Sequence, residues 1–339
     1  MRYAALAISL ALLACLAGCS KHAPTPLRVF HADSLARPFQ QMEQAFEREH
    51  PGVDVQRESY GSAVAIRQVT ELGRPADLIA SADYLLIDHM MIAKGQAADW
   101  NVLFARNSIV IAWLEPQKAL TADNWADVLS RGGERAGLSD PNQDPCGYRT
   151  LFSIYLAEKR LGKQGLFESF VLAHSNLRLA DEGGKAVIQV PTDVAYRPPL
   201  AMRPNAADLQ ALLESGVIDC MFTYRSVAVQ QKLGYLELPD EVNLGSAALA
   251  AQYDVVRARQ YADRLEKSVL VQATPIVYGL TIPTSAPHPE LALEFARFVL
   301  SDAGRRITEE NGQTPIFPAV YSAASRTAGA PFDLEQLKP

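Results

Sequence analysis

The segment SDPNQDPCGYR, residues 139–149, sets two Asp-Pro steps, a cysteine, a glycine and an arginine directly before the amphipathic pattern TLFSIYLAEKRLG. Asp144 is of a residue type that caps helices with its side chain. Pro145 suits a first helical position, because an N–H group there has no partner inside the helix. A helix N-terminus carries unpaired N–H groups and a partial positive charge, so this segment predicts a place where an anion can bind.

Other junctions in the chain also put a serine or asparagine where a strand or loop passes into a predicted helix. They are Ser34, Ser62, Ser81 and Asn205. In an open α/β sheet, ligands bind beyond the carboxyl ends of the strands, where the next helices begin. Several helix starts that converge there could hold an anion without a lysine or arginine. Simple capping explains the same residues, so spacing alone leaves both interpretations open.

Short apolar runs alternate with helical patterns along the chain. Predicted strands cover 27–30, 53–59, 76–81, 107–113, 136–140, 218–224 and 274–283, and predicted helices cover 34–49, 62–72, 205–215, 288–307 and the segment after Pro145. This alternation indicates an α/β fold with largely parallel sheets, and 339 residues suit two domains. Residues 180–203 mix glycine, proline and charge, which predicts irregular structure.

Composition excludes several classes of function. The formal net charge is −6 and no run of lysines and arginines occurs, which argues against a nucleic-acid partner. The chain has no Gly-x-Ser-x-Gly elbow, no phosphate-binding loop and no His-Glu-x-x-His motif, and its six histidines lack ligand spacing. A nucleophilic Cys146 would need a positioned histidine, and none is evident in the sequence. We therefore expect neither an enzyme nor a cofactor.

The N-terminus predicts export. Residues 1–18 contain one arginine followed by an apolar stretch that is short for a membrane-spanning helix, as in a signal peptide. The stretch ends in LAGC, which resembles the lipobox of bacterial lipoproteins and implies a lipid on Cys19, followed by a tether over residues 19–26. A secretory signal cut elsewhere is the alternative. An oxidising compartment would permit a disulfide between Cys146 and Cys220, which the sequence does not establish.

Ten motifs in sequence order carry a family resemblance. They are FHADSLARPF, ESYGSA, ADLIASADY, WNVLFARNSIVIAW, SDPNQDPCGYR, LLESGVID, YRSVAVQQ, LPDEVNLG, PIVYGLTIP and NGQTPIFP. Together they resemble the tungstate/molybdate solute-binding proteins of ABC importers, an archaeal-type branch related to the bacterial periplasmic molybdate-binding proteins. The resemblance covers about residues 27–318, and the DPCGYR segment is its most specific part.

The resemblance implies a type II periplasmic-binding-protein-like fold. Each of its two lobes is a mixed, mostly parallel sheet flanked by helices, and a tetrahedral oxyanion binds in the cleft between the lobes. By this resemblance the first lobe holds residues 27–106 and 279–339 and the second holds residues 112–270. Two crossover strands, near 103–112 and 271–279, would join them.

The resemblance also implies ligand-binding positions in both lobes. The predicted ligand-binding residues are Ser34, Ser62, Asp144, Pro145, Cys146, Ala206 and Tyr224, with Asp33 and Gly61 as further candidates. Ser34 and Ser62 would contribute hydroxyls and Cys146 its backbone N–H. Asp144 matches the first of two carboxylates that can bind the metal atom of the oxyanion directly.

The sequence departs from the family pattern where the second carboxylate is expected. Ala206 stands in place of that glutamate, Asp33 stands where glycine is usual, and Thr223 replaces a glutamate. A carboxylate beside a dianion repels it unless it bonds the metal or is protonated. The departures favour a tetrahedral, hydrogen-bonded site over octahedral coordination, and they leave helix capping as the alternative role of Asp144.

The function implied is that of a lipid-anchored, extracytoplasmic protein on the periplasmic side of a bacterial envelope membrane. It would capture molybdate or tungstate as a monomer and deliver the anion to an ABC permease and its ATPase. Two alternatives stay open: a binding protein for another tetrahedral oxyanion, such as sulfate or phosphate, and an oxyanion sensor.

Overall fold

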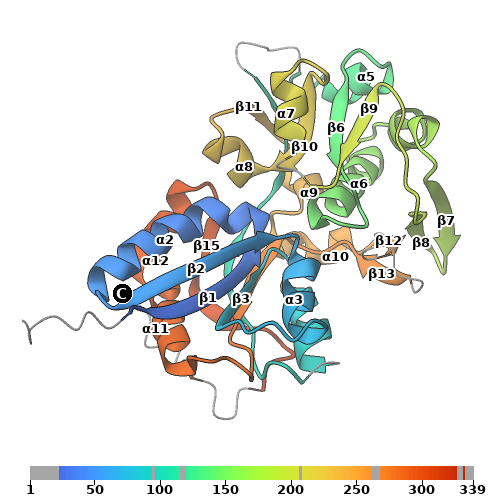
Figure 1. The fold of residues 1–339 in the computed structure, drawn as a ribbon. Helices are drawn as coiled ribbons and strands as arrows, with labels where there is room; N and C mark the ends of the chain where they lie inside the picture. Colours follow the sequence, from blue (N-terminus) through green and yellow to red (C-terminus); the bar gives the residue numbers. More distant parts are fainter. Residues whose placement is uncertain are drawn as a thin grey trace, which may run out of the picture.

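The computed structural model describes residues 23–93, 96–114, 120–205, 208–261, 268–326 and 331–332. Its α/β fold has two lobes, and we define each lobe by the sheets that it contains (Figure 1). The first lobe is built on the six-stranded sheet β15-β4-β14-β3-β1-β2, and the second lobe is built on the five-stranded sheet β11-β5-β10-β6-β9 and the four-stranded sheet β13-β12-β8-β7. The predicted signal peptide, Cys19 and Ala206 lie outside the described residues.

The first lobe combines the two ends of the described chain. Its strands are β1 (Thr25–Ala32), β2 (Val53–Tyr60), β3 (Leu78–Ser81), β4 (Val102–Arg106), β14 (Val277–Thr281) and β15 (Thr314–Tyr321). Its helical elements are η1 (Asp33–Leu35), α2 (Ala36–Glu49), α3 (Ser62–Thr70), α4 (Tyr84–Ile87), η2 (Asp88–Ala93), α11 (Pro289–Leu300) and α12 (Asp302–Glu310).

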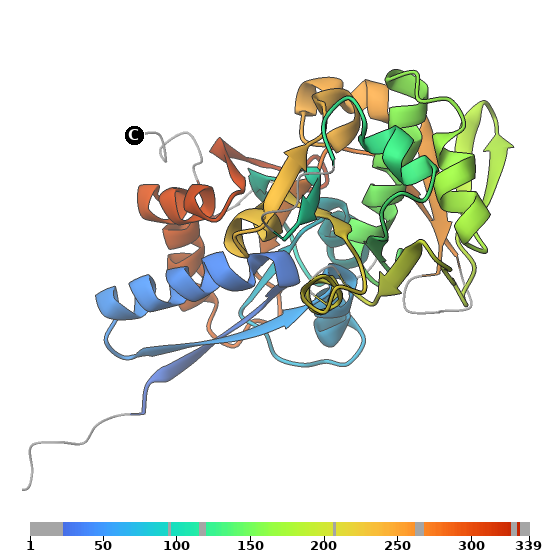
Figure 2. The same cartoon turned by 90° about the horizontal axis from the view of Figure 1, so that it is seen from above.

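The packing of α2 shows what holds this lobe together. Phe39, Met42 and Phe46 follow a helical spacing and are fully buried, and Phe46 packs edge to face on Phe295 of α11. Burying each of these side chains stabilises the fold by roughly 1.5 to 3 kcal/mol. The N-terminal end of α2 faces the second lobe in both views (Figures 1 and 2). Packing on the sheet therefore fixes the direction in which that helix start points.

The second lobe is formed by one continuous stretch. Its strands are β5 (Ile109–Trp113), β6 (Ala136–Ser139), β7 (Arg178–Glu182), β8 (Lys185–Gln189), β9 (Leu200–Arg203), β10 (Cys220–Tyr224), β11 (Gly234–Glu237), β12 (Val256–Gln260) and β13 (Val269–Gln272). Its helical elements are α5 (Trp125–Ser130), α6 (Pro145–Arg160), η3 (Phe167–Val171), η4 (Leu172–His174), α7 (Leu209–Glu214), α8 (Arg225–Gln230), α9 (Asp240–Asn243), η5 (Ala247–Leu249) and α10 (Ala250–Tyr253).

Helix α6 is the centre of the second lobe. Every residue from Pro145 to Ala157 is buried, so the helix is covered on all sides rather than on one face. Gly147 lies against the preceding loop, where a Cβ atom would come within 2.5 Å of the Ser139 carbonyl oxygen. The glycine of the DPCGYR segment therefore allows the loop to pack directly on the first turn of the helix.

The chain passes between the lobes twice. The first passage, residues 107–108, joins β4 to β5, and the second, residues 273–276, joins β13 to β14. The two passages lie side by side, since the Asn107 N–H donates to the Ile276 carbonyl at 3.1 Å. The residue boundaries predicted for the lobes stay a prediction.

The expectation of irregular structure over residues 180–203 was wrong. The segment contains the end of β7, all of β8 and β9, and β9 pairs in parallel with β6. The β7–β8 hairpin turns at Gly183 and Gly184, whose φ angles are +67° and +81°. A tight hairpin turn with two positive φ angles suits two glycines, so these residues form the turn rather than interrupt the strands.

The single helix expected over residues 288–307 is two helices. The chain breaks at Ser301, whose hydroxyl caps α12 by accepting the Gly304 N–H at 3.3 Å. A Cβ atom on Gly304 would come within 2.2 Å of the Val299 carbonyl oxygen, so the two helices meet closely. The apolar pattern continues across the break because both helices cover the same lobe.

The two cysteines in the described part of the chain, Cys146 and Cys220, are free and buried, so the disulfide that the sequence left open is not formed. Of the helices in the residues that the structure describes, none is long and apolar enough to cross a membrane.

Candidate functional site between the lobes

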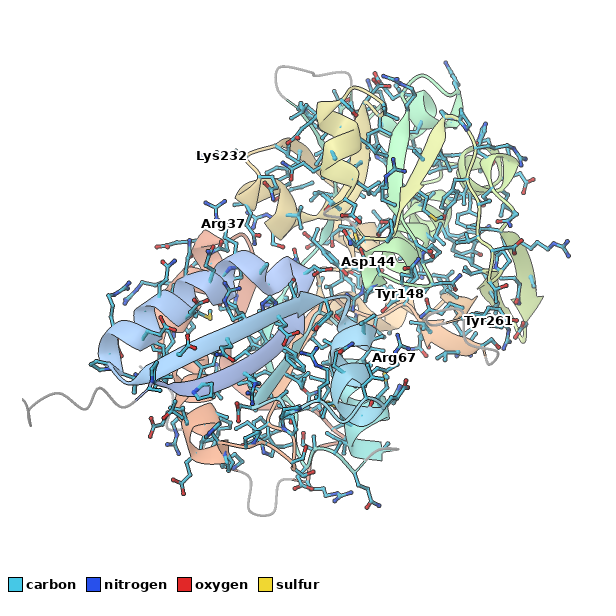
Figure 3. All side chains as sticks on the ribbon, in the orientation of Figure 1. Arg37, Arg67, Asp144, Tyr148, Lys232 and Tyr261 are labelled. Carbon is cyan, nitrogen blue, oxygen red and sulfur yellow. The ribbon has the colours of Figure 1, made fainter. Side chains whose placement is uncertain are left out.

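A cavity of about 180 Å³ lies between the lobes and brings most of the predicted site residues together. The predicted residues that line it are Asp33, Ser34, Gly61, Ser62, Asp144, Pro145 and Tyr224. Asn205 of the second lobe lies there as well. Figure 3 shows Asp144 and Tyr148 at the junction of the lobes. Cys146 is not among the lining residues, and Ala206 lies outside the described ones.

Ser34 of the first lobe reaches the cavity from η1. Its Oγ lies 2.9 Å from the Tyr278 hydroxyl oxygen, and Asn107 Nδ2 donates to that oxygen at 2.7 Å. Because Tyr278 accepts from Asn107, its own proton is available to Ser34 Oγ. The Ser34 proton is then free to point into the cavity. Gln313 Nε2 also donates to the Ser34 carbonyl at 3.0 Å, which holds the backbone in place.

Ser62 is the first residue of α3, and its Oγ accepts the Ala82 N–H at 3.0 Å. Helix capping, the alternative that spacing left open for Ser62, does not occur, because Gly61 occupies the N-cap position and no side chain caps α3. With Oγ engaged as an acceptor, the hydroxyl proton of Ser62 is free for another partner. Gly61 itself lies close to the second lobe, since a Cβ atom there would be 2.9 Å from the Gln143 carbonyl oxygen.

Tyr224 ends β10 and provides a hydroxyl from the second lobe. Arg149 Nη1 donates to the Tyr224 hydroxyl oxygen at 2.9 Å, so this hydroxyl too accepts from the protein and keeps its proton for the cavity. Burial raises the pKa of Tyr224 well above its usual range, and the Arg149 guanidinium opposes part of that rise. The hydroxyl therefore stays protonated at neutral pH and acts as a donor.

Asp144 caps α6 as predicted. Its Oδ1 accepts the Cys146 N–H at 2.9 Å, and Pro145 occupies the first helical position. The Cys146 N–H, predicted to bind the ligand, is therefore bonded to Asp144 in this structure. The Cys146 thiol is fully buried, and burial raises its pKa, which keeps the thiol protonated and weakly nucleophilic. Direct bonding of Asp144 to a metal atom stays a prediction.

Several helices begin at this cavity. Ser62 starts α3, Pro145 starts α6 and Tyr224 is the N-cap of α8, and all three residues line it. Each helix start adds partial positive charge, and exposed starts stabilise a negative charge by roughly 0.3 to 1 kcal/mol each. Ser81 does not cap a helix as predicted, since Asp83 caps α4, whereas Asn205 Oδ1 accepts the Asp208 N–H at 2.9 Å directly before α7.

Charged side chains border the cavity. Arg37 of α2 lines it and donates through Nη1 to the Gln230 carbonyl of α8, which links the lobes. Asp33 accepts from Ser59 Oγ at 2.6 Å, and burial raises the pKa of its carboxyl, with Asp208 adding to the rise. The raised pKa reflects a site where negative charge on Asp33 is disfavoured.

Sequence reasoning missed the residues behind these hydroxyls. Each of these residues lies in one of the motifs that carry the resemblance but had no role assigned: Asp83, Asn107, Arg149 and Tyr278. His31, near the end of β1, is fully buried, and burial lowers its pKa to about 4, which suits a structural role.

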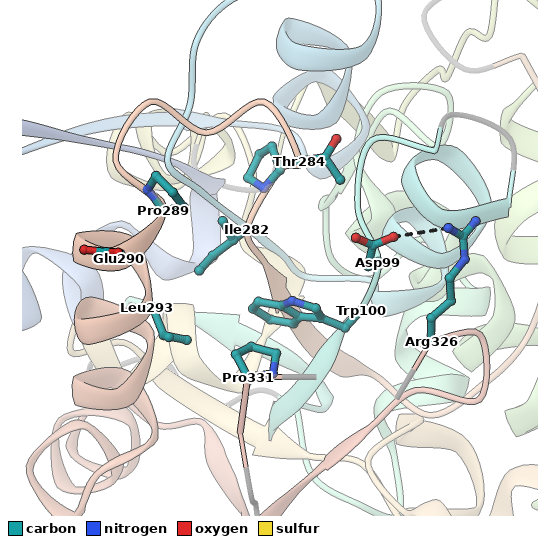
Figure 4. A pocket seen from close by; sticks show the side chains of 10 residues that line it. Asp99, Trp100, Ile282, Thr284, Pro289, Glu290, Leu293, Arg326 and Pro331 are labelled. Atoms are coloured by element: carbon teal, nitrogen blue, oxygen red, sulfur yellow. Dashed lines mark hydrogen bonds and ion pairs between the residues drawn. The ribbon is translucent and has the colours of Figure 1, made fainter. Parts of the chain in front are cut away.

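Larger cavities lie elsewhere. One of about 580 Å³ in the first lobe is lined by Trp100, Ile282 and Leu293, with the Asp99–Arg326 ion pair at its edge (Figure 4). It contains none of the predicted site residues. Another, of about 620 Å³, is also lined by both lobes but shares only Asp144 and Pro145 with the predicted set. The small cavity between the lobes is therefore the candidate site.

The chain is similar to known proteins over most of its length. The family described as bacterial extracellular solute-binding protein matches residues 27–314. A protein of Methanoculleus marisnigri named an uncharacterized solute-binding protein is 41% identical, covering 86% of this chain and 82% of the relative. The molybdate/tungstate-binding protein WtpA of Pyrococcus abyssi is 38% identical, covering 94% of each chain.

A solved structure supports the architecture. The periplasmic molybdate-binding protein of Azotobacter vinelandii superposes with a TM-score of 0.58 at 15% identity, covering 85% of this chain and 98% of that one. At this identity the likeness shows the fold alone, and it confirms the two-lobe fold predicted from the sequence. The chain belongs to the family of bacterial extracellular solute-binding proteins, in a branch that contains a molybdate/tungstate-binding protein.

Proposed function

We propose that this protein captures molybdate or tungstate in the cavity between its lobes and delivers the anion to an ABC permease and ATPase. The observation that carries the proposal is the direction of the cavity hydrogen bonds. Ser62 and Tyr224 both accept from protein donors, so each presents its own proton to a ligand. Ser34 can do the same through Tyr278. Such a site suits a ligand that only accepts hydrogen bonds.

The size and charge of the cavity support a small anion. Its volume of about 180 Å³ is below the roughly 300 to 1,000 Å³ of pockets that hold drug-sized molecules. The helix starts that meet there favour negative charge, and Arg37 adds a cation. The name of the Pyrococcus abyssi relative supports molybdate and tungstate over other oxyanions.

The proposal also covers the membrane anchor, whose Cys19 lies outside the described residues, the oligomeric state and the absence of catalysis. A lipid on Cys19 would hold the protein on the periplasmic side of a bacterial envelope membrane, and the protein would act as a monomer without a cofactor and without catalysing a reaction. The raised pKa of the buried Cys146 thiol is in keeping with binding rather than covalent chemistry.

Calorimetric titration of the protein starting after Cys19 tests the ligand. We expect molybdate and tungstate to bind tightly and sulfate to give no detectable heat, because donors fixed for a larger anion hold a smaller one poorly. Preferred binding of sulfate or phosphate would show that the proposed ligand is wrong, although the protein would still be an oxyanion-binding protein. Absence of binding by all four anions would contradict an oxyanion role.

A further inference from the structure

The guanidinium of Arg149 contacts both lobes at the cavity. Its Nη1 donates to the Tyr224 hydroxyl of the second lobe and to the Ala82 carbonyl of the first lobe, both at 2.9 Å. Its Nη2 lies 3.2 Å from Asp83 Oδ2, also in the first lobe. Arg149 itself belongs to α6 of the second lobe and does not line the cavity. It therefore reaches the site only through other residues.

The same contacts connect Arg149 to the first-lobe hydroxyl. The Ala82 carbonyl accepts from Arg149, while the Ala82 N–H donates to Ser62 Oγ at 3.0 Å. The Arg149 side chain thus holds Tyr224 directly and bonds the carbonyl of Ala82, the same residue whose N–H holds Ser62. The hydroxyl oxygens of Ser62 and Tyr224 each accept one hydrogen bond from the protein. That bond leaves the hydroxyl proton of each residue to point into the cavity.

Asp83 is a rigid partner for Arg149. Its Oδ1 caps α4 by accepting the Leu85 N–H at 3.0 Å, and its Oδ2 accepts the Tyr148 hydroxyl at 2.8 Å. The side chains of Arg149 and Asp83 are only 3% and 5% exposed. A buried charge needs its partner, so this pair is stable only while the lobes are in contact.

We propose that Arg149 is a positioning residue for oxyanion binding, which aligns the Tyr224 hydroxyl toward the ligand only when the lobes meet. The inference rests on the proposed function and deepens it. When the lobes separate, Arg149 loses Asp83 and Ala82 and exchanges them for water, so nothing fixes the guanidinium against Tyr224. Closure and alignment of the donor are then coupled, and a ligand that needs the aligned donor favours the closed state.

A double-mutant cycle tests this coupling. The variants are Arg149→Lys, Tyr224→Phe and both together, with calorimetric titration of molybdate and tungstate. Lysine keeps the charge but lacks the planar fork that bonds three partners at once. We expect each single change to weaken binding roughly tenfold or more. Because Arg149 acts through Tyr224, the double variant should bind about as the weaker single variant does.

Closure is measured separately by small-angle scattering with and without molybdate. Arg149→Lys should reduce the compaction that the ligand causes, whereas Tyr224→Phe should leave most of it, because Arg149 bonds the opposite lobe and the Tyr224 hydroxyl bonds Arg149 of its own lobe. The matched control is Arg135→Lys. Arg135 pairs with Asp219 inside the second lobe at an exposed position, and its change should alter neither measurement.

Three outcomes separate the possibilities. If unmodified protein binds none of the oxyanions, the proposed function fails and this inference fails with it. If unmodified protein binds and Arg149→Lys binds and compacts equally well, or if the two changes multiply in the cycle, only this inference fails. Should Arg149→Lys not fold by circular dichroism, Asp83→Asn carries the same test, since it removes the charge that Arg149 meets across the lobes.

Discussion

The two halves of the cavity are supported in different ways. In the first lobe, Ser62 is held by the Ala82 N–H and Ser34 by Tyr278, and these are neutral groups of the same lobe. In the second lobe, Tyr224 is held by the charged Arg149, whose counter-ion Asp83 lies across the cleft. The first-lobe half is therefore complete before the lobes meet, whereas the second-lobe half is completed by closure.

The largest effect should come from breaking the ion pair that crosses the cleft. Asp83→Ala leaves the Arg149 charge buried without its partner, and such losses cost about 3 to 5 kcal/mol. Denaturant unfolding measures the change. The exposed pair of Arg135 and Asp219 serves as control, and Asp219→Ala should have a far smaller effect. Equal losses in the two variants would mean that burial of the first pair contributes nothing.

Removing one hydroxyl from each half should weaken molybdate binding by similar amounts. Ser62→Ala and Tyr224→Phe each delete a donor to a charged ligand, worth roughly 1.5 to 3 kcal/mol, or a roughly 10- to 100-fold loss of affinity. Titration measures both variants. A normal affinity in Ser62→Ala would contradict the preformed first-lobe half.

Gly61→Ala should hinder the approach of the lobes without disturbing either one alone. Its Cβ atom would lie 2.9 Å from the Gln143 backbone oxygen of the second lobe, so backbone must shift before the lobes meet. We expect a loss of affinity at the low end of the roughly 1 to 3 kcal/mol typical of overpacking. Gly52→Ala is the control, since nothing lies within 4 Å of its added Cβ atom. Unchanged scattering of the ligand complex would contradict the expectation.

Asp33→Asn should have the smallest effect and should depend on pH. Burial raises the pKa of Asp33, so its charged form destabilises the fold, and stability is lost as pH rises through that pKa. A charged Asp33 also repels a dianion, and asparagine should raise molybdate affinity at neutral pH by about threefold, within the range of partly exposed charges. The gain should shrink at lower pH, where wild-type Asp33 is protonated. A gain independent of pH would rule out this electrostatic cause.

Local patterns predicted most of the fold. The strand-helix alternation up to α3 and the capped start of α6 at Asp144 were readable because apolar spacing and cap residues act over a few positions. The β7–β8 hairpin was missed because two glycines were taken as a sign of irregular structure. The break at Ser301 was missed because both helices bury their apolar faces in the same lobe, so the pattern runs on.

The site was only partly predictable. Resemblance pointed to Ser34, Ser62 and Tyr224, which do line one cavity. It could not give the pairing of Arg149 with Asp83, because the two residues lie far apart in the sequence and no local pattern links them. Their meeting depends on how the lobes pack, whereas Asn107 meets Tyr278 because β4 pairs with β14 in the first-lobe sheet.

The two passages between the lobes also impose an order on folding. Every strand of the second lobe comes from residues 109–272, so its sheets can form from one uninterrupted stretch. The first-lobe sheet places β4 between β14 and β15, whose first residues, Val277 and Thr314, come long after Arg106, the last residue of β4. As the chain emerges during export, the second lobe can therefore complete its core first, while the first lobe must keep an open sheet edge at β3, and β4 without a sheet partner, until the C-terminal strands arrive.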